Sequence, residues 1–131
     1  MELTSYITGI GHIGLPTRDM NATLEFYEGL GFSIDWKIEK ESAILLAFLK
    51  LGDCVFETFV NPNAAGVPGA IDHLALSVSD VDSVYRLITE SGRYQVIEPE
   101  KGVQSLPFYN GVKFFTILGP NGEKIEFNQK L

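Results

Sequence analysis

The sequence has little cysteine, histidine or basic charge, and each shortage excludes a class of protein. Its 131 residues contain 1 Cys, 2 His, and 10 Lys and Arg against 17 Asp and Glu, for a net charge of −7. Nucleic-acid binding draws on clustered cations, and the basic residues here are scattered singly, so we expect no nucleic-acid partner. Cys54 cannot form an internal disulfide, which fits a reducing compartment and a filler role in a strand.

The sequence also lacks a long hydrophobic run. No stretch of about 18 apolar residues occurs that would cross a bilayer, so we expect no membrane partner. The opening residues MELTSYITGI have no basic segment ahead of an apolar one, as a secretion signal would, which favours a cytoplasmic location. The composition, 45% hydrophobic and 21% charged, is typical of one globular domain at this length.

The first half of the chain has the pattern of a strand, a helix and three strands. Asp19 can cap a helix with an apolar stripe that begins at Met20 and ends near Gly31. The segments SIDWKIE, SAILLAFLK and CVFETFV follow as strands. The next segment, 61–70, is rich in Pro, Gly and Asn and is expected to be a linker.

The second half repeats this pattern. The segment IDHLALSVSD matches IGHIGLPTRD, so that Asp80 takes the place of Asp19, and the strands VKFFTIL and EKIEFNQ match the last strands of the first half. We therefore predict an α+β fold made of two tandem βαβββ modules. The predicted single domain covers 1–131, with modules at about 5–60 and 70–131 joined by the linker 61–70.

The two histidines occupy equivalent places in this repeat. His12 and His73 are 61 residues apart, each on the opening strand of its module. Side chains alternate across a strand, so each histidine points away from the apolar neighbours that a helix covers. One such histidine is usually a packing or surface residue, but two equivalent ones in a chain without others favour a shared functional role.

Two glutamates complete the set. Glu57 and Glu126 lie among apolar residues on the last strand of each module, where a carboxylate is costly unless a positive group meets it. Their separation exceeds that of the histidines by eight residues, which the longer second-half segment EPEKGVQSLPFYNG accommodates. The set His12, Glu57, His73 and Glu126 suits one divalent ion per site, Zn, Ni, Co, Mn or Fe, with room for substrate oxygens.

The strings GHIGLPTRDMNATLEFYEGLGF, DHLALSVSDVD and GPNGEKIEF resemble the vicinal oxygen chelate superfamily, which includes glyoxalase I, extradiol dioxygenases and bleomycin-resistance proteins. The resemblance implies mixed sheets that curl as an open barrel around a metal site. It also implies a lactoylglutathione lyase-like enzyme that isomerises a 2-oxoaldehyde–thiol adduct through an enediolate. By resemblance, Glu126 is the first choice of proton-transferring base and Glu57 the second. A homodimer with a site shared between subunits is favoured, with a small-molecule substrate.

Three alternatives stay open. An extradiol dioxygenase normally uses a further histidine, which this chain lacks. Methylmalonyl-CoA epimerase is similar around the first histidine but has glutamine where Glu57 stands. A bleomycin-resistance-type binding protein has no metal site, and the complete ligand set argues against it.

One residue departs from the glutathione-using enzymes. Their arginine, four residues after the first histidine, is replaced here by Pro16. Other basic residues would then have to meet a charged substrate, and the candidates are Arg18, Arg93, Lys101, Lys113 and Lys124. We also consider the segment 98–111 as a lid or pocket rim, with Phe108 and Tyr109 excluding water from the ion.

Overall fold

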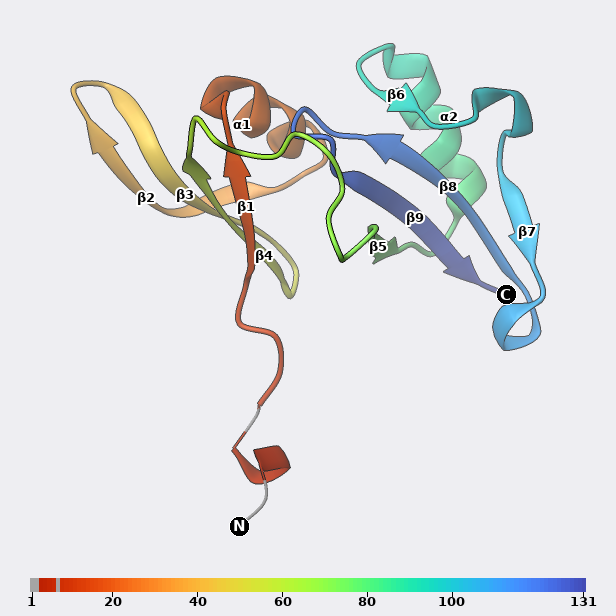
Figure 1. The fold of residues 1–131 in the computed structure, drawn as a ribbon. Coiled ribbons are helices and arrows are strands. Elements are labelled where there is room, and N and C mark those ends of the chain that lie inside the picture. Colours follow the sequence, from red (N-terminus) through yellow and green to blue (C-terminus); the bar gives the residue numbers. More distant parts are fainter. Residues whose placement is uncertain (1–2, 7) are drawn as a thin grey trace. The chain divides into compact units, whose positions relative to one another are not determined.

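The computed structural model describes residues 3–6 and 8–131, and the chain divides into two compact units, Met1–Ala64 and Ala65–Leu131. In each unit, the described residues form one α-helix that packs on a mixed sheet (Figure 1). The predicted α+β class is therefore confirmed. No helix in residues 3–6 and 8–131 is long and apolar enough to span a membrane.

The first unit has the predicted βαβββ order after a short 3-10 helix. Its described sheet has the strand order β1-β4-β3-β2, in which β1 runs parallel to β4 and the other pairs are antiparallel. The elements are η1 (Leu3–Ser5), β1 (Ile13–Thr17), α1 (Met20–Gly29), β2 (Ser33–Lys40), β3 (Ala43–Leu51) and β4 (Cys54–Val60).

Helix α1 covers one face of this sheet. Asp19 caps it by accepting a hydrogen bond from the backbone N–H of Ala22 at 3.0 Å, as the sequence predicts. Tyr27 is fully buried, and its ring lies 4.9 Å from that of Phe56 on β4. The helix therefore buries the β4 residues that alternate with Glu57 and leaves Glu57 on the open face.

The second unit repeats the order with a modified edge. Its described sheet has the order β5-β9-β8-β6, and β7 also pairs with β8. Strand β5 runs parallel to β9, as β1 runs to β4. The elements are β5 (Leu74–Ser77), α2 (Val81–Ser91), β6 (Gln95–Val96), η2 (Pro99–Lys101), β7 (Gln104–Leu106), η3 (Phe108–Asn110), β8 (Val112–Leu118) and β9 (Lys124–Lys130).

Helix α2 packs on β8 and β9 (Figure 1). Asp80 caps the helix through the backbone N–H of Ser83 at 3.1 Å, again as predicted, and Gly92 ends it in the left-handed conformation. The buried rings of Phe115 and Phe127 stack at 4.9 Å beneath it. This covered face mirrors the first unit, so the opposite face of the second sheet is the open one.

The segment 98–111, considered above as a lid or pocket rim, contains short regular elements. Strands β6 and β7 pair with opposite ends of β8 and together take the place that β2 has in the first unit. Between them the chain leaves the sheet at Glu98, whose backbone is left-handed with φ 54°, and turns through η2. Backbone hydrogen bonds to the edge of β8 explain why this segment is regular, because they hold Gln104–Leu106 as a strand.

Candidate metal site

The first unit brings His12 and Glu57 together on its open face. Gly14 on β1 lies opposite Glu57 on β4, and His12 comes two residues before Gly14, on the same side. His12 Nε2 is 4.0 Å from Glu57 Oε2, with side chains 47% and 27% exposed. The ring of Phe48 meets the imidazole edge-on at 5.5 Å between centroids.

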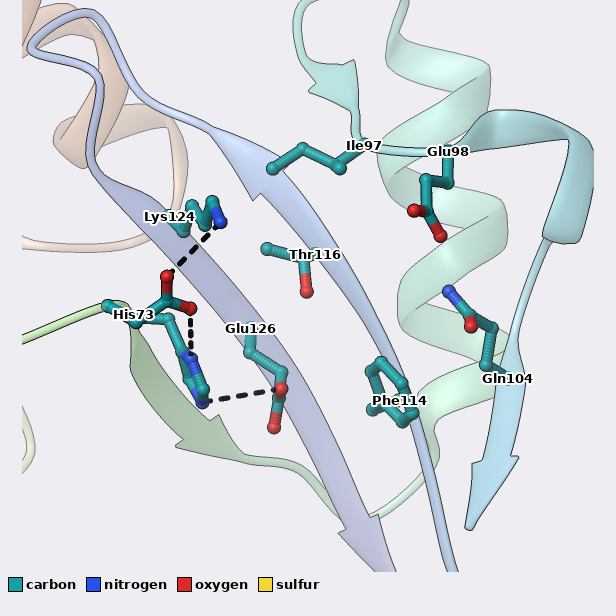
Figure 2. Close-up of a pocket in the computed structure, with 9 residues that line it drawn as sticks. His73, Ile97, Glu98, Gln104, Phe114, Thr116, Lys124 and Glu126 are labelled. Carbon is teal, nitrogen blue, oxygen red and sulfur yellow. Dashed lines mark hydrogen bonds and ion pairs between the residues drawn. The ribbon is translucent and has the colours of Figure 1, made fainter. Parts of the chain in front are cut away.

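The second unit repeats this pair with His73 and Glu126. Ala75 on β5 lies opposite Glu126 on β9, which is the register of Gly14 and Glu57. His73 Nε2 is 3.6 Å from Glu126 Oε1, with side chains 44% and 15% exposed (Figure 2). The equivalence that the sequence predicts for the two pairs thus extends to strand register and to the imidazole nitrogen that faces the carboxylate.

Both pairs fit a divalent metal ion. Ligand atoms about 2.1 Å from one ion are about 3.0 Å apart at a right angle and about 4.2 Å apart on opposite sides. The observed 3.6 and 4.0 Å fall between these values. In residues 3–6 and 8–131, the structure groups no three His, Cys, Asp or Glu side chains so that they would hold a metal ion. Each unit therefore offers two potential ligands.

The second pair has additional polar contacts. The Asp72 carboxylate lies 2.9 Å from His73 Nδ1 and forms an ion pair with Lys124 at 3.3 Å. The hydrogen bond with His73, followed by the contacts with Lys124, lowers the pKa of the Asp72 carboxyl below its ordinary value. On the other side, the Asn128 amide donates to Glu126 Oε2 at 2.9 Å.

A hollow of about 260 Å³ lies beside the second pair (Figure 2). Glu98 and Gln104, from the segment that bridges β6 and β7, stand across the hollow from His73. Phe108 and Tyr109 are exposed and are not among its lining residues, so the water-excluding rim considered for them is not seen at this hollow. The lining residues are Asp72, His73, Ile97, Glu98, Gln104, Phe114, Thr116, Lys124 and Glu126.

The basic residues considered for substrate binding have partners within the chain. Arg18 donates from Nε to the carbonyl of Ala64 at 2.8 Å, and Lys101 pairs with Glu98 at 2.8 Å. Lys113 pairs with Asp82, Lys124 pairs with Asp72, and Arg93 lies over the ring of Tyr94. Lys124 alone of these five lines the hollow.

Cys54 is half-buried at the start of β4. Burial, reinforced by the negative charge of Asp53, raises the pKa of its thiol. The thiol therefore stays protonated at neutral pH, in agreement with the structural role expected for it.

Sequence reasoning missed Asp72 and Asn128. Asp72 directly precedes His73, and Asn128 follows Glu126 by two residues and so shares its strand face. That alternation was enough to place Asn128 beside Glu126. The contact of Asp72 depends on a side-chain rotamer, which sequence spacing does not specify.

Comparison with known proteins agrees with the fold of the two units. Residues 9–127 match the model of the Glyoxalase/Bleomycin resistance protein/Dioxygenase superfamily. The uncharacterized protein YwbC of Bacillus subtilis is 33% identical over 128 residues, which cover 92% of this chain and 97% of YwbC.

Solved structures show the same fold. A glyoxalase family protein from Enterococcus faecalis has a TM-score of 0.75 at 24% identity, covering 94% of this chain and 98% of the other. A bleomycin resistance determinant encoded on the transposon Tn5 has a TM-score of 0.67 at 22% identity, with coverage of 94% and 98%. At these identities the likeness concerns the fold alone.

Proposed function

Because this chain belongs to the Glyoxalase/Bleomycin resistance protein/Dioxygenase superfamily, we propose that it is a metal-dependent isomerase of the glyoxalase I type. The substrate is the adduct of a 2-oxoaldehyde with a small thiol. One observation carries the proposal: in both units, the histidine that directly precedes the first strand sets an imidazole nitrogen 3.6–4.0 Å from a carboxylate oxygen on the last strand. The ligands of one divalent ion per site are His12, Glu57, His73 and Glu126.

The four side chains divide the chemical work. A bound divalent ion supplies Lewis acidity toward two adjacent substrate oxygens, which stabilises the negative charge that develops when a neighbouring carbon loses its proton. Glu126 takes this proton and returns it to the adjacent carbon, and Glu57 is the alternative base. Glu126 is the less exposed of the two, so water competes less for its carboxylate.

The thiol is proposed to be one other than glutathione. Pro16 stands where glutathione-using relatives have arginine, and the structure pairs Lys101, Lys113 and Lys124 with carboxylates of the same chain. A substrate with two free carboxylates would therefore have to break existing ion pairs. A smaller thiol avoids that cost, and the cytoplasm, where we expect the protein to act, keeps such thiols reduced.

The full site is proposed to form in a homodimer, with the His–Glu pair of one subunit joined by the complementary pair of the other. In a mixture of His12→Ala and Glu126→Ala subunits, one site of each mixed dimer then carries both substitutions and the other carries none. Mixing two inactive variants should restore activity. An inactive mixture with verified heterodimers would contradict sharing.

The central test combines metal analysis with an assay. We expect purified protein to hold about one Zn, Ni, Co, Mn or Fe ion per proposed site, as measured by elemental analysis. Methylglyoxal should be turned over with at least one of several thiols, and activity should vanish with chelator and return with added ion. A metal-loaded protein that turns over methylglyoxal with none of the thiols would contradict the proposed substrate class.

The second candidate is a binding protein that sequesters a planar small molecule. The open face of the first unit favours it, since Trp36 is 57% exposed and its ring lies 6.1 Å from that of Phe48. Aromatic side chains of this kind stack on flat ligands. Full ligand affinity in protein stripped of metal would favour this candidate over the enzyme.

A further inference from the structure

The contacts around His73 restrict which of its nitrogens carries the proton. An ionised carboxylate only accepts hydrogen bonds, so the 2.9 Å contact with Asp72 requires the proton on Nδ1. In neutral imidazole, Nε2 then carries a lone pair. This nitrogen faces Glu126 at 3.6 Å, which is the direction from which a metal ion would bind (Figure 2).

Lys124 holds the Asp72 carboxylate in place. The two oxygens of Asp72 are used separately, one toward Lys124 Nζ at 3.3 Å and the other toward His73 Nδ1 at 2.9 Å. Because the Asp72 side chain is largely exposed, the hydrogen bond with His73 by itself competes with water. A second partner on the neighbouring strand restricts the carboxylate to the rotamer that meets the imidazole.

The first unit has no such arrangement. Position 11, equivalent to Asp72, is glycine, and Val55 on β4 takes the place of Lys124 on β9. Among the described residues, His12 contacts the carboxylate of Glu57 and the ring of Phe48, and its Nδ1 meets no carboxylate. The imidazole of His12 is thus free to adopt either tautomer.

We infer that Asp72, held by Lys124, is a positioning residue that fixes the tautomer and orientation of His73 and makes the second unit the preorganised half of the metal site. This inference rests on the proposed function, because it assigns His73 Nε2 to the metal. Carboxylates that accept the second N–H of a ligating histidine raise metal affinity in this way, commonly by about 10–100-fold.

The first test needs no metal. Long-range ¹H–¹⁵N spectra of metal-free protein at about pH 8 report the tautomer of each imidazole, and a His12→Ala variant assigns the two signals. We expect His73 to carry its proton on Nδ1, and Asp72→Ala to shift it to the mixture shown by His12. Lys124→Met should shift it part of the way, and Asp72→Glu should restore much of the Nδ1–H form. A His73 tautomer that Asp72→Ala leaves unchanged would overturn the inference.

The second test measures zinc affinity by competition with a chromophoric chelator. Asp72→Ala should weaken binding by about 10–100-fold. The matched control is Asp53→Asn, which removes a charge at the exposed β3–β4 turn and should change affinity less than twofold. Equal losses in both variants would overturn the inference, because net charge would then explain them.

The two tests separate the inference from the proposed function. If wild-type protein binds no metal but its His73 tautomer responds to Asp72→Ala, the proposed function is overturned. The conclusion that Asp72 fixes the tautomer of His73 is then supported. Metal binding with an unresponsive tautomer would overturn the inference and leave the function standing. Thermal unfolding monitored by circular dichroism checks that each variant is folded.

Discussion

In the second unit, Asp72 contacts His73 and Asn128 contacts Glu126, whereas Gly11 and Phe59 occupy these positions in the first unit. The two His–Glu pairs share strand register, yet only the second has hydrogen-bond partners that hold its side chains among the described residues. The repeat of the element order therefore places the proposed ligands alike in both units, while the residues around each pair differ.

The residues around the two His–Glu pairs also differ, being more apolar in the first unit and more polar in the second. Opposite Glu57 stands Phe48, and opposite Glu126 stands Thr116. The open face of the first unit adds exposed aromatic and aliphatic side chains such as Trp36 and Ile38, whereas Glu98, Gln104 and Lys124 line the hollow of the second. The open face of the first unit is thus apolar beside its His–Glu pair, and that of the second unit is polar.

Of the predicted changes, removal of either proposed ligand histidine should have the largest effect on turnover and metal affinity. His73→Ala and His12→Ala should each reduce metal-dependent turnover by about 10³-fold, since a metal contributes several kcal/mol to the transition state. His73→Ala should reduce metal affinity more than His12→Ala, because it removes the preorganised ligand. Isothermal titration with zinc checks the order, and equal affinities would contradict the asymmetry of the two units.

Truncation of equivalent core residues should test whether the two units lose similar free energy of unfolding. Leu49 faces Phe56 and Ile117 faces Ile125, and both Leu49 and Ile117 are fully buried. Leu49→Ala and Ile117→Ala should each lower the free energy of unfolding by about 2–5 kcal/mol. Denaturant unfolding measures the loss, and hydrogen exchange shows whether faster exchange stays within the altered unit.

Introducing the missing carboxylate should make the first unit resemble the second. A side chain fits at position 11, because a Cβ built on Gly11 meets nothing within 4 Å. Gly11→Asp should move the His12 tautomer toward Nδ1–H and raise zinc affinity by up to about tenfold. Gly11→Ser serves as the control for backbone effects, and an unchanged tautomer in the aspartate variant would show that a lysine partner is also required.

Removal of one helix-cap charge should have the smallest effect. Hydrogen bonds from the side chain and backbone of Ser83 lower the pKa of Asp80 below its ordinary 3.8. A lowered folded-state pKa contributes stability that is present above the unfolded value and is lost as the pH falls through the folded one. Asp80→Asn keeps a capping oxygen, so its denaturant midpoint should lie slightly below wild type at pH 7 and converge with it as the pH falls through the lowered pKa of Asp80.

The fold was predictable because its signals are local and repeated. Asp19 and Asp80 mark helix starts through hydrogen bonds to nearby backbone groups, and alternation of apolar residues marks the strands. Sequence pattern also indicated one histidine and one glutamate on the inward face of each module, and the structure brings each pair together through the parallel pairing of β1 with β4 and of β5 with β9.

The rest depends on contacts that sequence pattern does not carry. The short strand β7 is held by hydrogen bonds to the edge of β8, a tertiary contact that overrides the low strand propensity of its segment. The Asp72 carboxylate that contacts His73 also contacts Lys124, which is 52 residues from Asp72. Such distant partners determine side-chain rotamers, and the pattern of a single sequence does not predict which distant residues will be partners.

The break between β6 and β7 has a consequence for the evolution of this fold. The chain from Ile97 to Gln104 contributes side chains to the hollow, while the ladder between β8 and β9 that carries Glu126 is complete without it. Insertions or substitutions there can change the lining of the hollow without disturbing the strands that carry the proposed ligands. New specificity can therefore arise in this one segment, separately from the reaction chemistry.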